Sequence, residues 1–197
     1  MSGSALHPRW LSAGLYVPEK KLTNADVAKF VDTTDQWILQ RTGIRQRFIA
    51  HEDECSTTMA IEAGKEAIKN AGIHSHQIDL LIVATSTPSK HMPSCASWVQ
   101  KALDIKPCPA FDLNAACSGF MYALAEVELW IKSGKAKCAL IIGSDVSSRI
   151  LNWEDRSTCV LFGDGAGACI FAADQRKGLV SVDLGADGQF AELLQTE

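Results

Sequence analysis

The sequence predicts a layered α/β fold whose sheet is mainly parallel. Apolar residues at helical spacing alternate with short apolar strands along the 197 residues. Residues 80–85 and 139–143 are apolar almost throughout, as strands covered on both faces are. The chain has no internal repeat, low-complexity segment or linker, and it is long enough to bury a full core. We therefore expect one compact unit.

The first part of the chain is expected to contain two strands and three helices. The strands are predicted at residues 10–17 and 45–50, and the helices at 25–31, 35–42 and 56–72. Thr23 or Asn24 can cap the first helix and Thr34 the second, since these side chains accept hydrogen bonds from helix N-terminal N–H groups. Ser56 or Thr57 opens the third helix. Glycines 43 and 72 end the last two helices.

The rest of the chain continues the alternation. Strands are predicted at residues 80–85, 110–113, 139–143, 169–173 and 179–184. Pro93 suits the first turn of a helix that runs to Leu103. A second helix follows residue 119, because Phe120, Leu124, Val127 and Ile131 recur at three- and four-residue steps.

A cysteine lies at the turn between strand 110–113 and this helix, in Asn114-Ala-Ala-Cys117-Ser-Gly. Unpaired N–H groups and the positive end of the helix dipole favour a thiolate at that position. The same N–H groups could stabilise an oxyanion if the thiolate attacked a carbonyl, as in a nucleophile elbow. The alternative is a buried structural cysteine, since cysteine is often buried and this chain has seven.

Composition narrows the class of protein. A net charge of -4 without a Lys/Arg cluster argues against nucleic-acid binding, and no apolar run is long enough to span a membrane. Seven cysteines without close pairs indicate free thiols in a reducing cytoplasm. No C-x-x-C motif is present, so no metal site is expected, and His74 and His76 are interpreted as solvated.

Three further features have two interpretations each. Residues 163–168, Gly-Asp-Gly-Ala-Gly-Ala, either cradle a phosphate or let backbones approach closely, and they lack the Lys-Ser/Thr of a P-loop. Trp37 and Arg41 share a helix face and either hold a flat aromatic group with a phosphate or pack as a surface pair. Trp153 and Arg156, in the loop after an apolar strand, carry the same ambiguity.

Several motifs, in order, resemble the β-ketoacyl-acyl carrier protein synthase III family, the initiating condensing enzymes of bacterial type II fatty-acid synthesis. They are Tyr16-Val-Pro, Thr23-Asn-Ala-Asp, Asp32-Thr-Thr-Asp-Gln-Trp37-Ile-Leu-Gln-Arg41-Thr-Gly-Ile-Arg45, Pro109-Ala-Phe-Asp-Leu-Asn-Ala-Ala-Cys117-Ser-Gly-Phe, Gly143-Ser-Asp, Asp155-Arg156 and Phe162-Gly-Asp-Gly-Ala-Gly-Ala. The resemblance runs from Trp10 onward. It implies a thiolase-like fold, an αβαβα sandwich of two similar halves, assembled as a homodimer. On this basis residues 1–175 form the first half and residues 176–197 begin the second.

The resemblance also implies roles for individual residues. Cys117 is the nucleophile, which takes an acyl group, typically acetyl, from acyl-CoA and passes it to malonyl-acyl carrier protein in a decarboxylative condensation. Trp37 and Arg156 sandwich the CoA adenine, and Thr33 and Arg41 lie at the CoA mouth. Met92 reaches into the partner subunit's acyl pocket. Acyl-CoA is a substrate, and no cofactor is expected. Arg45 and Arg47 offer charge for an acidic carrier protein, or form an ordinary solvated strand end.

The family's catalytic histidine and asparagine lie in its second half, and none of the five histidines here matches that motif. The chain alone is therefore expected at most to acylate itself. It is interpreted as the N-terminal portion of a synthase, as a natural half-protein that pairs with another chain, or as a non-catalytic interaction subunit. Acyl-CoA transacylases and quinolone- or polyketide-starter synthases share this first half and remain alternatives.

Overall fold

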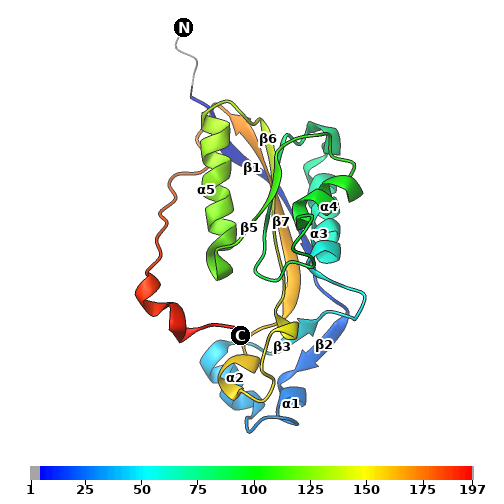
Figure 1. Cartoon of the computed structure of the whole chain (residues 1–197), viewed down its shortest axis with the longest axis vertical. Helices are drawn as coiled ribbons and strands as arrows, with labels where there is room; N and C mark the ends of the chain where they lie inside the picture. Colours follow the sequence, from blue (N-terminus) through cyan, green and yellow to red (C-terminus); the bar gives the residue numbers. More distant parts are fainter. Residues whose placement is uncertain (1–4, 197) are drawn as a thin grey trace. The chain divides into compact units, whose positions relative to one another are not determined.

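The structure is a computed structural model that describes residues 5–196 (Figure 1). It divides into two compact units, which corrects the single unit expected from the sequence. Unit 1 contains residues 5–16, 55–145 and 166–184, and unit 2 contains residues 17–54, 146–165 and 185–196. Unit 2 is separate because it has an apolar core of its own, formed by Val27, Ile38, Cys159 and Val160. This division does not test the boundary expected after residue 175, which stays a prediction.

Unit 1 is built on a five-stranded sheet with the strand order β1-β7-β6-β4-β5. The strands are β1 His7–Tyr16, β4 Leu80–Ala84, β5 Ala110–Leu113, β6 Cys138–Val146 and β7 Asp164–Asp174. Strand β4 runs parallel to both β5 and β6, whereas β1 pairs with β7 in antiparallel register. The strands β4 and β6 are buried on both faces, as their apolar runs predict.

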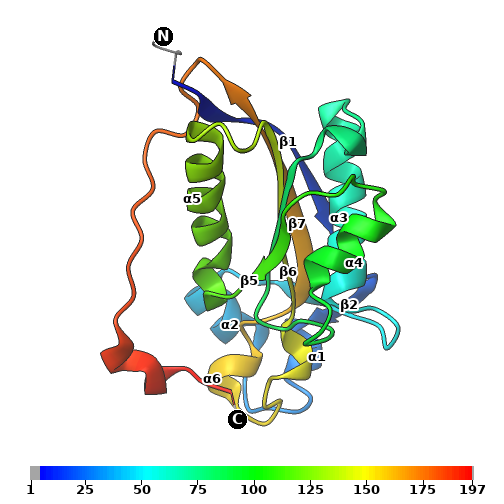
Figure 2. The same cartoon turned by 45° about the horizontal axis from the view of Figure 1, so that its top comes forward.

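Helices cover both faces of this sheet (Figure 2). The helices α3 Ser56–Ala71 and α4 Cys95–Ala102 lie on one face, and α5 Gly119–Lys132 lies on the other. Val127 and Ile131 of α5 belong to a buried cluster with Ile82 of β4 and Ile141 of β6. The layers α3/α4, sheet and α5 confirm the α/β class.

The contact between β1 and α3 depends on small residues. Ser12 Oγ donates a 2.7 Å hydrogen bond to the Ala67 carbonyl oxygen across it. A Cβ atom placed on Gly14 would lie 2.2 Å from the Ala63 carbonyl oxygen, so only glycine permits this approach. The N-terminal strand is thereby held directly against the helix backbone.

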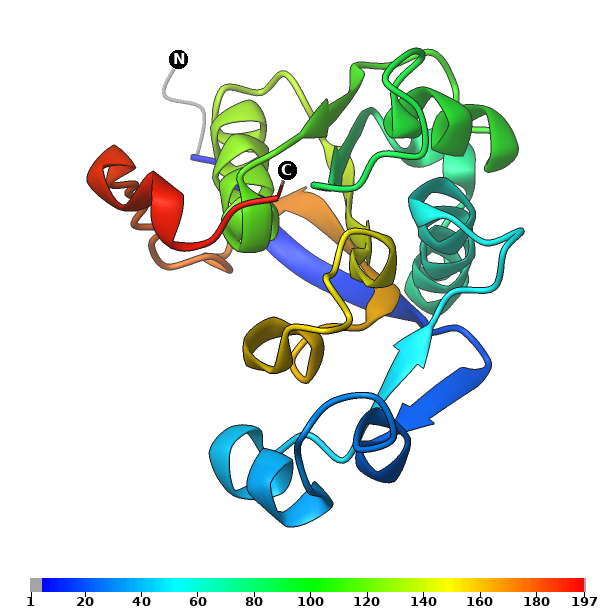
Figure 3. The ribbon, with the colours of Figure 1, turned by 60° about the horizontal axis from the view of Figure 1, so that its bottom comes forward.

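Unit 2 contains a two-stranded antiparallel ribbon and three short helices (Figure 3). They are β2 Lys20–Thr23, β3 Gln46–Ile49, α1 Asn24–Val27, α2 Asp35–Thr42 and α6 Arg156–Cys159. Arg47 of β3 is buried, and its guanidinium donates to the Leu22 and Val160 carbonyl oxygens and to Asn24 Oδ1. Burial lowers its pKa. Arg47 is therefore a structural link, and its proposed exposure to a carrier protein is wrong.

Most predicted elements are present, and the differences have local causes. Helix 35–42 has the bounds and Thr34 cap that were predicted. Ser56 is the first residue of α3 but Cys55 is its cap residue. Ser94 caps α4, so Pro93 lies before the helix and not in the first turn where it was predicted. Strand β2 and helix α6 were missed, because their four-residue sequences, Lys20-Lys-Leu-Thr and Arg156-Ser-Thr-Cys, are mainly polar. Short 3-10 turns also occur at Ser75–Gln77, Ala116–Ser118, Ser147–Arg149 and Gly188–Leu193.

Two strand predictions need correction. The strand predicted at residues 169–173 begins earlier, at Asp164, since Ala166 and Ala168 are buried at every second position and pair with β1. Residues 179–184 are not a strand. Only the Leu179 N–H reaches β1, donating to the Pro8 carbonyl oxygen at 3.1 Å, and no neighbouring strand continues the ladder within the described part of the chain.

Candidate active site

Cys117 is exposed on a tight turn between β5 and α5. The Ala116 N–H donates to Asn114 Oδ1 at 3.0 Å, and the Ser118 N–H donates to the Ala115 carbonyl oxygen at 3.0 Å. These bonds close a 3-10 turn over Ala116–Ser118 that continues into α5 at Gly119. The sequence prediction that places Cys117 at the beginning of this helix is confirmed.

The turn contains a strained residue. Ala116 has a φ of 45°, in the left-handed region where a Cβ atom crowds the following carbonyl oxygen. Such a conformation costs about 1–2 kcal/mol for a residue other than glycine. It persists only where the surrounding structure imposes it, and residues of this kind cluster at functional sites. The sequence alone gave no sign of this strain.

Both ends of the turn are fixed. Asp112 of β5 accepts hydrogen bonds from the Cys95 and Ala96 N–H groups at 2.7 and 2.8 Å, and so caps α4. At the other end, a Cβ atom on Gly119 would lie 3.2 Å from the Ala84 Cβ atom. The beginning of α5 thus rests on the end of β4, and Cys117 is held between two anchored segments.

The electrostatic setting of Cys117 suits a reacting carbonyl. As part of a first helical turn, its N–H has no intrahelical acceptor, and no other acceptor is found for it within residues 5–196. An unpaired N–H beside the thiol can donate to an oxyanion formed where the thiolate attacks. The exposed sulfur leaves room for a thioester substrate.

The other six cysteines are less accessible than Cys117. Burial raises the pKa of Cys108, Cys159 and Cys169, and it raises that of Cys138 to about 11. At Cys55 burial also acts to raise the pKa, but hydrogen bonds from Thr58, Thr57 and Ser89 outweigh it and lower the pKa. Cys55 is therefore the internal comparison for any reactivity assigned to Cys117.

In unit 2 the structure brings together three of the residues assigned to CoA. The Arg41 guanidinium carbon lies 4.4 Å from the Trp37 ring centroid, and that of Arg156 lies 4.8 Å from it. Arg156 also donates to the Asp32 carbonyl oxygen at 2.9 Å. The next residue, Thr33, has a buried Oγ1 without a hydrogen-bond partner among the described residues. An indole with two guanidinium groups over its ring offers a stacking face and positive charge for a flat, anionic group.

The structure also bears on Met92, on the histidines and on the expectations about metal and membrane. Met92 is 84% exposed, as a residue that inserts into another subunit must be. His76 bonds Asp104 at the surface, and within residues 5–196 no three His, Cys, Asp or Glu side chains group as metal ligands do. None of the described helices has the length and hydropathy of a transmembrane helix.

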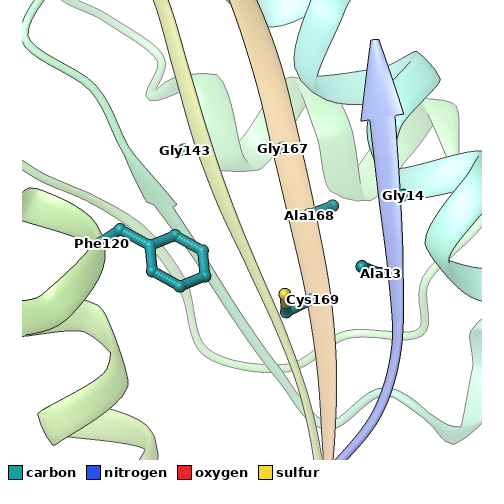
Figure 4. A pocket seen from close by; sticks show the side chains of 7 residues that line it. All are labelled: Ala13, Gly14, Phe120, Gly143, Gly167, Ala168 and Cys169. Atoms are coloured by element: carbon teal, nitrogen blue, oxygen red, sulfur yellow. The ribbon is translucent and has the colours of Figure 1, made fainter.

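One open, apolar cavity of about 350 Å³ lies in unit 1 against the face of the sheet that α5 covers (Figure 4). Small residues from β1, β6 and β7 form its floor, and Phe120 of the first turn of α5 forms a wall; the lining is Ala13, Gly14, Phe120, Gly143, Gly167, Ala168 and Cys169. Sequence reasoning missed this cavity, because it depends on small residues that three strands bring together.

Comparison with known proteins places this turn in a family. The family model of 3-oxoacyl-[acyl-carrier-protein (ACP)] synthase III matches residues 111–188, which include Cys117. Beta-ketoacyl-[acyl-carrier-protein] synthase III of Ehrlichia canis is 49% identical over 188 residues, covering 94% of this chain and 59% of the relative. The chain belongs to this synthase III family.

Solved structures of synthase III proteins agree with the fold. The crystal structure of the Aquifex aeolicus synthase III has a TM-score of 0.83 at 50% identity, covering 86% of this chain and 55% of that one. The priming β-ketosynthase of the R1128 polyketide pathway has a TM-score of 0.85 at 34% identity, covering 90% and 53%. The chain thus spans about 59% of the length of the curated synthase III relative and just over half of these structures.

Proposed function

We propose that this chain carries the acyl-accepting half-reaction of a synthase III enzyme, with Cys117 as the nucleophile. The observation that supports this most strongly is an exposed thiol on a strained, anchored turn at the beginning of α5, inside the segment that matches the synthase III model. The Cys117 sulfur attacks the thioester carbonyl carbon of an acyl-CoA, typically acetyl-CoA. A new sulfur–carbon bond forms, the bond to the CoA sulfur breaks, and the thiol proton leaves with the CoA thiol.

The CoA moiety is assigned to unit 2. Trp37 offers a stacking face for adenine, and Arg41 and Arg156 offer charge for phosphates. Thr33, whose Oγ1 is buried, follows Asp32, the residue that Arg156 contacts. Because the Arg41 and Arg156 guanidinium groups both lie over the Trp37 ring, adenine has to displace one of them in order to stack there. No cofactor is required, since the acyl-CoA itself brings the activated acyl group.

The second step, decarboxylative condensation with malonyl-acyl carrier protein to a 3-ketoacyl product, is proposed for a protein that also supplies the family's histidine and asparagine. The homodimer, the cytoplasmic location and the insertion of Met92 into a partner's acyl pocket belong to the same proposal. So does the division into a first half at residues 1–175 and the beginning of a second at 176–197. The exposure of Met92 and the unpaired state of all seven cysteines support it.

Intact-mass spectrometry of the purified chain after incubation with acetyl-CoA tests the first step, with Cys117→Ala as the control. One added acetyl group that disappears in the variant is the expected result. An adduct that persists in Cys117→Ala refutes the assignment of Cys117. No adduct at all refutes acyl transfer by this chain and favours a non-catalytic interaction subunit.

A polyketide-type starter synthase is the second candidate, favoured by the 34% identical priming β-ketosynthase. Offering acetyl-CoA together with longer acyl-CoAs in one reaction separates the two. Preferential transfer of the longer acyl groups to Cys117 supports the starter synthase.

A further inference from the structure

One acidic residue of unit 1 has a set of contacts that the acyl-transfer proposal does not use. Asp145 lies near the end of β6, and its Oδ1 atom accepts five hydrogen bonds from one loop. The donors are the Ser86 N–H at 2.8 Å, Ser86 Oγ at 2.9 Å, Thr87 Oγ1 at 2.9 Å, the Thr87 N–H at 3.1 Å and Thr85 Oγ1 at 3.3 Å. No cation pairs with Asp145 among the described residues. The partners of Asp145 Oδ1 are therefore neutral donors from a single loop.

The loop that Asp145 holds is joined to both ends of the Cys117 turn. The Thr85 N–H donates to the Leu113 carbonyl oxygen at 3.1 Å, which fixes the last residue of β5 before the turn. Ala84, the residue before Thr85, supports Gly119, the first residue of α5 after the turn. Ala84, the last residue of β4, and Thr85, the first donor to Asp145, thus contact the two ends of the turn.

Asp145 also emerges on the appropriate face of the sheet. Residues two apart on a strand share a face, and a Cβ atom on Gly143 would lie 3.5 Å from Phe120 Cδ2 of α5. Asp145 therefore projects from β6 toward the layer that contains α5. A displacement of the Thr85–Thr87 loop is transmitted to the turn through Leu113 and Gly119.

We propose that Asp145 is a positioning residue for Cys117. It fixes the end of β4 on which the turn rests, and so keeps the Cys117 sulfur and N–H in the geometry needed for thioester attack. This inference rests on the proposed role of Cys117 as the nucleophile. Asp145 itself touches no reacting atom.

Asp79 provides a matched control. Its carboxylate accepts the Lys137 N–H at 3.0 and 2.9 Å and the Cys138 N–H at 2.9 Å, and so fixes the beginning of β6 beside the beginning of β4. Asp79 and Asp145 therefore each accept hydrogen bonds that join β4 to β6, Asp79 at the beginning of these strands and Asp145 at their end. Only Asp145 is connected to the turn.

The experiment compares Asp145→Ala, Asp145→Asn and Asp79→Ala with the unaltered chain. Two quantities are measured: the rate of Cys117 acetylation by acetyl-CoA at several concentrations, and hydrogen–deuterium exchange of residues 113–120. In Asp145→Ala the maximal acetylation rate is expected to fall about tenfold or more, since misplacement by about 1 Å can cost about a hundredfold. The acetyl-CoA concentration for half-maximal rate should stay within about twofold, because CoA is assigned to unit 2. Exchange at 113–120 should rise.

Asp145→Asn keeps an acceptor oxygen and should show a smaller loss in the same direction, so it decides the question if the alanine variant does not fold. Asp79→Ala should acetylate at the unaltered rate and leave exchange at 113–120 unchanged. Equal rates and exchange in all variants overturn the proposal, as does an equal loss in Asp79→Ala. If the unaltered chain takes up no acetyl group, the role of Cys117 fails instead, and exchange at 113–120 alone decides whether Asp145 positions the turn.

Discussion

Adding one methyl group at Gly14 or at Gly167 should have opposite effects, although the two residues lie on paired strands. Gly14 of β1 faces α3, where a Cβ atom would lie 2.2 Å from the Ala63 carbonyl oxygen and 2.4 Å from the Ala67 nitrogen. Gly167 of β7 faces the apolar cavity, and its Cβ atom would meet nothing within 4 Å. The same substitution therefore tests which face each strand presents.

The size of the effect follows from the clash. Real Cβ contacts stay beyond 3.0 Å, so the shortfall from 3.0 to 2.2 Å requires β1 and α3 to separate by about 0.8 Å. A gap of about 0.5–1 Å forfeits a quarter to a half of each dispersion contact across the interface. Because backbone atoms cannot rotate away, we expect a loss at the upper end of the overpacking range, about 3 kcal/mol. Gly167→Ala should gain about 0.4–1 kcal/mol by restricting the unfolded chain.

Urea unfolding followed by far-UV circular dichroism measures both changes. With a slope of about 2 kcal/mol per molar urea, Gly14→Ala should lower the midpoint by about 1.5 M, and Gly167→Ala should raise it slightly. Equal midpoints for the two variants, or a Gly14→Ala midpoint equal to that of the unaltered chain, would refute the strand register and the packing of β1 on α3.

Three other predictions concern the turn, the acid stability of unit 2 and the thiols. Ala116→Gly relieves the positive φ, worth about 1–2 kcal/mol, but adds about 0.4–1 kcal/mol of unfolded-state entropy, so stability should rise by about 0–1.6 kcal/mol. In Ala116→Gly the acetylation of Cys117 should be slower, because glycine makes the turn more flexible. A lower free energy of unfolding in this variant would show that Ala116 is not strained. Hydrogen bonds from Lys29 and Thr23 lower the pKa of Asp26, and hydrogen bonds from Ser157 and Thr158 lower that of Asp155. The stabilisation that these two carboxylates provide is complete above the ordinary pKa of 3.8 and is lost as pH falls below that value. Hydrogen exchange in α1 and α6 should therefore increase below pH 3.8. In Asp26→Asn or Asp155→Asn the change of exchange with pH should be smaller. Iodoacetamide at pH 8 should label Cys55 before Cys138, whose pKa burial raises to about 11, and the reverse order would contradict the burial of Cys138.

The sequence predicts elements well where long periodic patterns and strong caps coincide. Helix α2 has its predicted bounds because Thr34 caps it and Gly43 ends it with a φ of 73°. The buried strands β4 and β6 are recognisable because nothing polar interrupts their central residues. Residues 179–184 show the limit of such patterns. Their composition favours a strand, but a strand also needs a partner ladder, which sequence pattern does not reveal.

The candidate site was predictable in its chemistry and not in its supports. A cysteine between an apolar strand and a helix identifies Cys117, and shared helix position pairs Trp37 with Arg41. The φ of Ala116, the five donors to Asp145 and the burial of Arg47 arise from contacts between residues far apart in the sequence. No local pattern encodes them, so only the folded chain shows how the turn is held.

The most direct test is to locate the acyl group after reaction with acetyl-CoA labelled with carbon-13 in the acetyl carbonyl. Tandem mass spectrometry of the digested chain must separate Cys117 from Cys108, because both lie between Lys106 and Lys132. The account predicts one labelled thioester per chain, on Cys117, with Cys55 unlabelled. Label on Cys55, or spread over several cysteines, would contradict the assignment of the Cys117 turn as the acyl-accepting site.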